Sequence, residues 1–172
     1  KQMTGFARPV PERLVAIAPG EIYRRVALLL DRDARRKGVV FRLEGDAAER
    51  AVIVDGQKLE QILFNLMANG LQALQGTGSV TVVAAVSGPK LEVVVTDTGP
   101  GIPEALRERV FDPFVTTKED GTGLGLSIVR QLLREMNGEV RLEFPANGGT
   151  GVRIQIPLGP PAAIDEAGGG PP

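Results

Sequence analysis

Three motifs in the second half of the chain decide the fold: DTGPGIP at 97–103, VFDPFVTTK at 110–118 and GTGLGLSIV at 121–129. An almost wholly apolar run, 91–96, leads into Asp97. A carboxylate at the end of a buried strand accepts hydrogen bonds and suits a donor such as the exocyclic amine of adenine. The last motif places three glycines before a helix, where backbone N–H groups and the helix dipole favour an anion. The order of the motifs predicts a nucleotide site with a base-reading end and a phosphate end.

Each motif also has an ordinary structural explanation when it is taken alone. Asp97 could be a turn residue. The stretch 110–114 could be a loop held by its apolar side chains, and 116–118 could be a solvated loop tip. The glycines of 121–125 do not complete a dinucleotide-binding fingerprint, because Leu126 stands where that motif requires glycine. The chain contains no GxxxxGK[ST] phosphate-binding loop. The prediction therefore depends on the joint order of the motifs.

Upstream, the predicted helix 55–75 carries Asn65 and Asn69 four residues apart. This spacing puts both on one stripe at the edge of the apolar face. Amide oxygens are reasonable Mg²⁺ ligands when phosphate and water fill the other positions. Alternatively, the two residues only solvate the helix edge, although Asn is a poor residue in the middle of a helix.

Composition excludes several kinds of chemistry. The 172 residues suffice for one domain, and the net charge of −1 does not indicate nucleic acid or an acidic membrane as a partner. The chain has no Cys and no His. Disulfides, Cys-ligated metal, imidazole catalysis and a phosphohistidine within this chain are therefore excluded. No apolar run approaches the ~20 residues of a membrane-spanning helix.

Hydrophobic periodicity and turn residues predict a mixed sheet covered by helices on one face, an α/β two-layer sandwich. We expect 1–8 to end a preceding helix, 9–18 to be a linker, 19–158 to be the folded domain and 159–172 to be a disordered tail. Because the chain starts within an expected helix end, we interpret it as a domain of a longer protein, which could be a membrane protein. The predicted helices are 19–37, 55–75, 103–109 and 125–136, and the predicted strands are 39–43, 51–54, 79–86, 90–96, 139–144 and 151–157.

Taken in order, the motifs resemble the boxes of the catalytic and ATP-binding domain of two-component sensor histidine kinases, in the GHKL superfamily. LFNLMANG at 63–70 resembles the N box, 97–102 the first glycine box, 110–114 the F box and 121–126 the second glycine box. Gly149-Thr150-Gly151 resembles the family's last adenine-side element. The resemblance covers roughly 18–158, and TTK at 116–118 resembles the nitrogen-regulation and dicarboxylate-sensor branch.

The resemblance implies a Bergerat-type fold that binds ATP with Mg²⁺. In it, Asp97 would accept a hydrogen bond from adenine N6, with Thr150 beside it through water. Asn69 would bind the metal with support from Asn65, and Lys118 would contact the phosphates. The catalytic set would be Asn65, Asn69 and Lys118. The full set of nucleotide-binding residues implied is Asn65, Asn69, Asp97, Gly99, Gly101, Ile102, Thr117, Lys118, Gly121, Thr122, Gly123, Leu124, Gly125, Leu126 and Thr150.

The implied activity is transfer of the γ-phosphoryl group to a His on a separate dimerisation domain. The implied partners are ATP or ADP, that dimerisation domain in a homodimeric parent and a response regulator. We expect the domain to be cytoplasmic and to make no membrane contact itself, even if the parent protein is anchored in a membrane. Two departures stand out: Gly70 replaces the usual Ala, which loosens the helix by about 1 kcal/mol, and Gln72 stands where many relatives carry a charge.

Other members of this superfamily offer competing interpretations. Gyrase-type and mismatch-repair ATPases carry a Glu base four residues before the metal-binding Asn, where this chain has Asn65. An amide cannot take a proton at neutral pH, which disfavours an ATPase. FDPF at 111–114 argues against a serine kinase of the anti-sigma type. A further alternative remains open, namely that the chain is a nucleotide-binding pseudokinase that serves as an interaction module.

Overall fold

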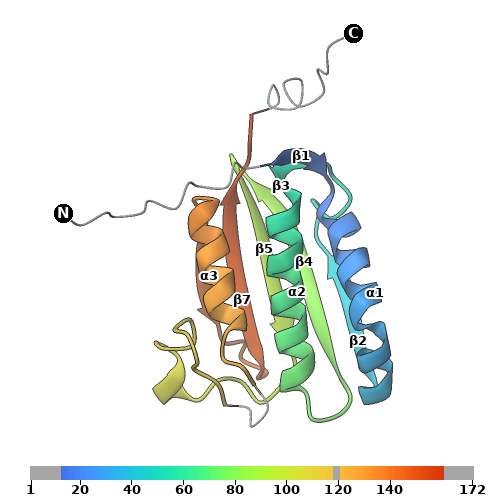
Figure 1. The fold of residues 1–172 in the computed structure, drawn as a ribbon. Coiled ribbons are helices and arrows are strands. Elements are labelled where there is room, and N and C mark those ends of the chain that lie inside the picture. The colour runs from blue at the N-terminus through green and yellow to red at the C-terminus, as the bar shows by residue number, and fades with distance from the viewer. Residues whose placement is uncertain (1–12, 118–120, 161–172) are drawn as a thin grey trace, which may run out of the picture.

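The computed structural model describes residues 13–117 and 121–160. A mixed five-stranded sheet forms one layer, and helices cover one of its faces (Figure 1). The strands lie in the order β2 (Val39–Glu44), β4 (Gly78–Ser87), β5 (Lys90–Asp97), β7 (Thr150–Pro157) and β6 (Glu139–Glu143). The helices are α1 (Pro19–Lys37), α2 (Gly56–Ala73) and α3 (Gly125–Glu135), and a short 3-10 helix spans Glu104–Leu106. The predicted two-layer α/β sandwich is confirmed.

The sheet is mixed because β2 pairs with β4 in parallel, whereas β4–β5, β5–β7 and β6–β7 are antiparallel. Both predicted hairpins, β4–β5 and β6–β7, are present. The β5–β7 register pairs Asp97 with Thr150 at the end of the sheet. These two residues are 53 positions apart in the sequence, yet they are direct neighbours on adjacent strands.

The structure corrects the expected linker 9–18, because Leu14–Ile17 form strand β1. β1 pairs with β3 (Val52–Asp55) in a separate two-stranded antiparallel sheet. The predicted strands 39–43 and 51–54, on either side of a polar turn, therefore belong to different sheets. The expected helix end at 1–8 and most of the expected tail lie outside the described residues; Gly159, the first tail residue, donates its N–H to Ile53 O at 2.8 Å.

Helix α2 is held at both ends. Asp55 is buried and caps the N-terminus, as its position before the helix predicts: Oδ1 accepts from Lys58 N at 3.1 Å. Its Oδ2 accepts from the backbone N of Arg13 at 3.3 Å. At the other end, Lys37 Nζ donates to the carbonyl oxygens of Leu71 and Leu74 at 3.1 and 3.0 Å. A cation here satisfies terminal carbonyls and complements the helix dipole.

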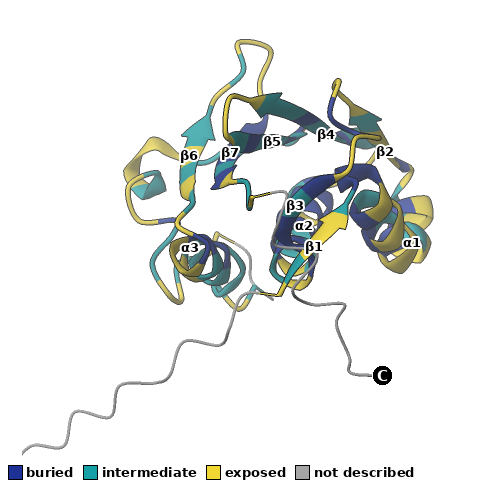
Figure 2. Ribbon diagram, turned by 90° about the horizontal axis from the view of Figure 1, so that it is seen from above, coloured by how far each residue is buried: buried dark blue, intermediate teal, exposed yellow. Residues whose placement is uncertain are grey.

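The hydrophobic core lies between the helices and the inner face of the sheet, where buried residues concentrate (Figure 2). Along β5, burial alternates with a period of two, so Val93 and Val95 face the core. Charged residues join the strands on the outer face: Arg153 pairs with Glu143 and Glu92. The hydrogen bond that the Arg153 guanidinium donates to Glu143 raises the pKa of Arg153. In the part of the chain described, no helix combines the length and apolar character that crossing a membrane requires.

Candidate functional site

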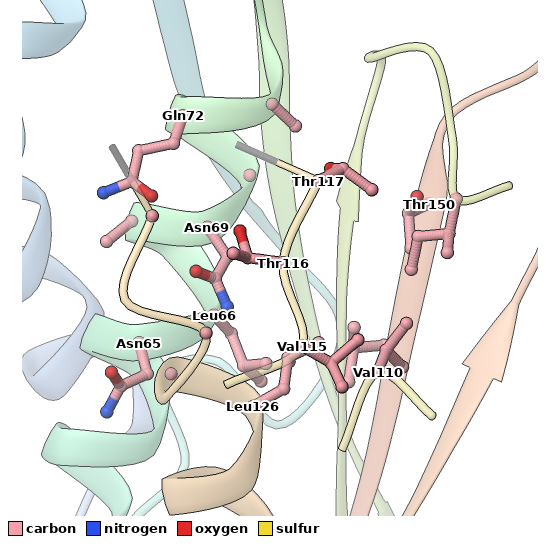
Figure 3. Close-up of a pocket in the computed structure, with 18 of the residues that line it drawn as sticks. Asn65, Leu66, Asn69, Gln72, Val110, Val115, Thr116, Thr117, Leu126 and Thr150 are labelled. Atoms are coloured by element: carbon pink, nitrogen blue, oxygen red, sulfur yellow. The ribbon is translucent and has the colours of Figure 1, made fainter. Parts of the chain in front are cut away.

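A cavity of about 440 Å³ opens between α2, the start of α3 and the ends of β5 and β7 (Figure 3). The segments 101–117 and 121–124 complete its walls. Every residue of the predicted nucleotide site that the structure describes lines this cavity, with the exception of Gly99. Lys118 lies outside the described residues. The motifs that are scattered through the sequence therefore meet around one cavity.

One end of the cavity is built around Asp97, which is 8% exposed. The backbone N–H of Gly99 donates to Asp97 Oδ1 at 2.8 Å, so Gly99 acts on the cavity through this carboxylate. A Cβ on Gly149 would stand 2.0 Å from the Asp97 carbonyl oxygen, and Gly149 has a φ of +90°. Only glycine accepts both conditions. This close approach brings Thr150 beside Asp97 at the cavity wall.

Apolar side chains form a further part of the lining. Leu66, Val110, Val115 and Leu126 gather between the asparagines of α2 and Thr150 on β7 (Figure 3). The predicted site contained only Leu126 from this group. An alternating pattern on the strands could have indicated the lining residue Val95, since it shares a face with the buried Val93. A largely apolar cavity with a few placed polar groups is typical of a site for a flat organic ring.

The wall formed by α2 is polar. Asn65, Asn69 and Gln72 follow one another along α2 (Figure 3). Gly125, the first residue of α3, lies against Asn69: a Cβ there would stand 3.1 Å from Nδ2 and 3.2 Å from Oδ1. The missing side chain lets the N-terminus of α3 approach the amide closely. Backbone N–H groups and the positive end of the helix dipole thus lie next to a possible metal ligand, which suits a phosphate group.

The F-box and glycine-box motifs pack against each other through their backbones. Phe114 N donates to Gly123 O at 3.0 Å. A Cβ on Gly123, where φ is +68°, would stand 2.5 Å from the Phe114 carbonyl carbon. This contact joins the two motifs at the cavity wall. It leaves the Phe114 side chain 76% exposed with an unusual φ of 66°.

The residues fit a magnesium ion that is bound together with phosphate. Among the residues described, no group of three His, Cys, Asp or Glu could hold a metal by itself. Mg²⁺ usually takes one or two protein oxygens and completes its shell with water and substrate phosphate. Asn69 offers such an oxygen. Asp97 is the one carboxylate among the described lining residues.

The fold and this site define an ATP-binding catalytic domain of the GHKL type. The model of the family described as histidine kinase-, DNA gyrase B- and HSP90-like ATPase matches residues 54–160, and the chain belongs to this family. The match begins just before α2 and ends just after β7, so it includes the whole cavity.

Within the family, the relatives are sensor kinases. The chain is 29% identical to sensor histidine kinase ZraS of Salmonella typhi over 91% of this chain and 34% of that protein. It is 33% identical to sporulation kinase C of Bacillus subtilis over 80% of this chain and 32% of that protein. The chain thus spans about a third of the length of these relatives.

Solved structures agree with this assignment. The catalytic domain of histidine kinase ThkA superposes with a TM-score of 0.77 at 34% identity, covering 84% of this chain and 95% of that domain. ThkA has also been solved in complex with the response regulator protein TrrA, with a TM-score of 0.73 at 30% identity, covering 85% of this chain and 42% of that chain. The fold is that of histidine kinase catalytic domains.

Proposed function

We propose that this chain binds Mg²⁺–ATP and transfers the γ-phosphoryl group to a His on a separate dimerisation domain of its parent protein. The single observation that carries the proposal is the contact between Gly125 and Asn69. It brings a helix N-terminus and an amide side chain together in the wall of a cavity that a buried carboxylate, Asp97, also lines. Phosphoryl transfer requires mainly such positioning and charge neutralisation.

The chain's own residues then have distinct roles. Asp97 accepts a hydrogen bond from adenine N6, while Thr150 lies beside it and the apolar lining contacts the ring. Asn69 gives an oxygen to Mg²⁺, supported by Asn65. The backbone N–H groups at the start of α3 bind phosphate, and Lys118 adds a positive charge. The bound Mg²⁺ supplies neutralisation of phosphate charge, for which the amide ligands fit.

Hydrolysis is the competing activity, because the family also includes ATPases. Asn65 lies one helical turn before Asn69, where a general base would be needed to activate water. Its Nδ2 donates to Gln61 O at 2.9 Å, a contact that belongs to the helix and moves no proton. Without a carboxylate in this place, transfer to an external acceptor is favoured over transfer to water.

The acceptor, the partners and the location follow from the same proposal. The chain has no His, so the acceptor lies on another domain. The parent protein is a homodimer joined through that domain, and it passes the phosphoryl group to a response regulator, as the ThkA–TrrA complex supports. The domain works in the cytoplasm, where ATP is present, and contacts neither nucleic acid nor membrane itself.

Labelling with γ-labelled ATP tests the proposal. The chain alone should bind ATP with Mg²⁺ but take up no label. Adding the parent's helical hairpin, in cis or as a separate fragment, should produce acid-labile phosphate on that hairpin. Acid-labile phosphate on the chain alone, or no nucleotide binding at millimolar ATP, would contradict the proposal. Nucleotide binding without any transfer would instead identify a pseudokinase that serves as an interaction module.

A further inference from the structure

We propose that Arg107 is a positioning residue for the adenine end of the cavity. It lies after the short 3-10 helix Glu104–Leu106 and outside the set of residues that line the cavity. This inference rests on the proposed function, since it names a residue that shapes the same nucleotide site.

The Arg107 guanidinium makes two contacts at once. Its Nε donates to the carbonyl oxygen of Ile102 at 3.1 Å. Its Cζ lies 3.8 Å from the centroid of the Phe144 ring, a cation–π distance. Ile102 lines the cavity, and Phe144 follows directly after β6. One side chain therefore connects the segment that forms the cavity wall with the end of the β6–β7 hairpin.

Among residues 13–117 and 121–160, the backbone of the segment around Arg107 bonds mainly to itself. The backbone hydrogen bonds described within 103–112 are all local, each joining residues three positions apart, such as Leu106 N to Pro103 O. The ion pair between Asp112 and Arg130 ties its far end to α3. On the adenine side, the cation–π contact of Arg107 with Phe144 joins this segment to the hairpin.

The position of this tie matters because the hairpin also carries the base-reading wall. Phe144 begins the turn that leads to Gly149 and Thr150, and Thr150 pairs with Asp97. A Cβ on Gly101 would stand 3.3 Å from the Gly149 carbonyl oxygen, so the two walls come within contact distance here. Arg107 thus fixes the wall that holds Gly101 and Ile102 relative to Asp97 and Thr150.

A guanidinium is suited to this double contact. It is planar, so its edge can donate a hydrogen bond while its face lies on an aromatic ring. An ammonium group is a compact charge with tetrahedral donors and does not reproduce both contacts in this geometry. We therefore expect Arg107→Lys to recover the function of the native residue only in part.

The test compares ligands with and without the base, using the chain as it exists. ATP, ADP and Mg²⁺–tripolyphosphate are titrated calorimetrically against the native chain, Arg107→Met, Arg107→Lys and Phe144→Leu. Arg107→Met should bind ATP and ADP about tenfold more weakly, from the loss of a cation–π contact and one hydrogen bond. Binding of tripolyphosphate should stay unchanged. Arg109→Met removes an exposed arginine two residues away and is the matched control.

A double-mutant cycle shows whether Arg107 and Phe144 act through their mutual contact. If they do, adding Phe144→Leu to Arg107→Met weakens ATP binding by less than the product of the two single effects. Unchanged ATP affinity in Arg107→Met, an equal loss for tripolyphosphate or an equal loss in Arg109→Met would overturn the inference. If Arg107→Met does not fold, Arg107→Lys and Phe144→Leu carry the same comparison. Failure of the native chain to bind ATP would refute the proposed function as well, whereas normal binding by every variant would refute the role of Arg107 alone.

Discussion

Replacing Asp97 by Asn should weaken the recognition of adenine and leave the binding of phosphate intact. The change keeps the size of the side chain, which matters because Asp97 is only 8% exposed. Gly99 N donates to Oδ1 at 2.8 Å, and this bond fixes the orientation of the new amide. The amide oxygen must stay toward the Gly99 N–H, because a flipped amide would point its NH₂ group at that N–H, and both groups are donors. The amide nitrogen therefore takes the other position, where it faces the donor N6 of adenine.

The cost follows from this opposition of donors. A buried donor without an acceptor costs about 1–3 kcal/mol, which is about a 5- to 150-fold loss of ATP affinity. GTP should lose less, because its base presents an acceptor where adenine has the amine. The assay is calorimetric titration of ATP, GTP and Mg²⁺–tripolyphosphate, with Asp46→Asn as a control for the same chemical change at an exposed site outside the cavity. An Asp97→Asn variant that kept the native ATP affinity and the native preference over GTP would refute the base-reading role.

Three further predictions concern the remaining parts of the site. Asn69→Ala should sharply reduce Mg²⁺-dependent ATP binding and transfer, with little change in the melting temperature without nucleotide, since alanine is the better helix residue; an unchanged requirement for Mg²⁺ would exclude Asn69 as a ligand. The native chain should hydrolyse ATP negligibly, and Asn65→Glu should raise hydrolysis by adding a base one turn before Asn69; fast hydrolysis by the native chain would place it with the ATPases. Gly149→Ala should lower both thermal stability and ATP affinity, because its Cβ would stand 2.0 Å from the Asp97 carbonyl oxygen. Gly148→Ala is the matched control, since its φ of +92° is nearly the same but nothing lies within 4 Å, and equal effects of the two substitutions would contradict the steric argument.

The sequence predicts the elements that local signals define. Helix α2 could be placed because Asp55 is a capping residue and the apolar face repeats with the helical period. The β4–β5 hairpin follows from two apolar runs on either side of Gly88-Pro89. In both cases the information lies within about twenty residues of sequence.

Features that depend on partners distant in the sequence were missed. β1 is four residues long and becomes a strand because β3 pairs with it from further along the chain: Ile17 pairs with Val52, 35 positions on, and Leu14 with Asp55, 41 positions on. β2 and β3 look like neighbours in the sequence, yet β2 pairs with β4 instead. The same reason hides Arg107 and Phe144, since no local pattern tells that an arginine will meet an aromatic ring 37 positions away. The motif order predicts the polar cavity residues, whereas the apolar lining depends on how the layers pack.

The anchoring of α2 has a consequence for closure around a ligand. Asp55 fastens the start of this helix to the incoming backbone at Arg13, and Lys37 fastens its end to α1. α2 is thus held at both ends, and Asn65 and Asn69 lie between the two anchors. When a nucleotide closes the cavity, we therefore expect the walls opposite α2, such as the segment 101–117, to move, while Asn65 and Asn69 keep their places.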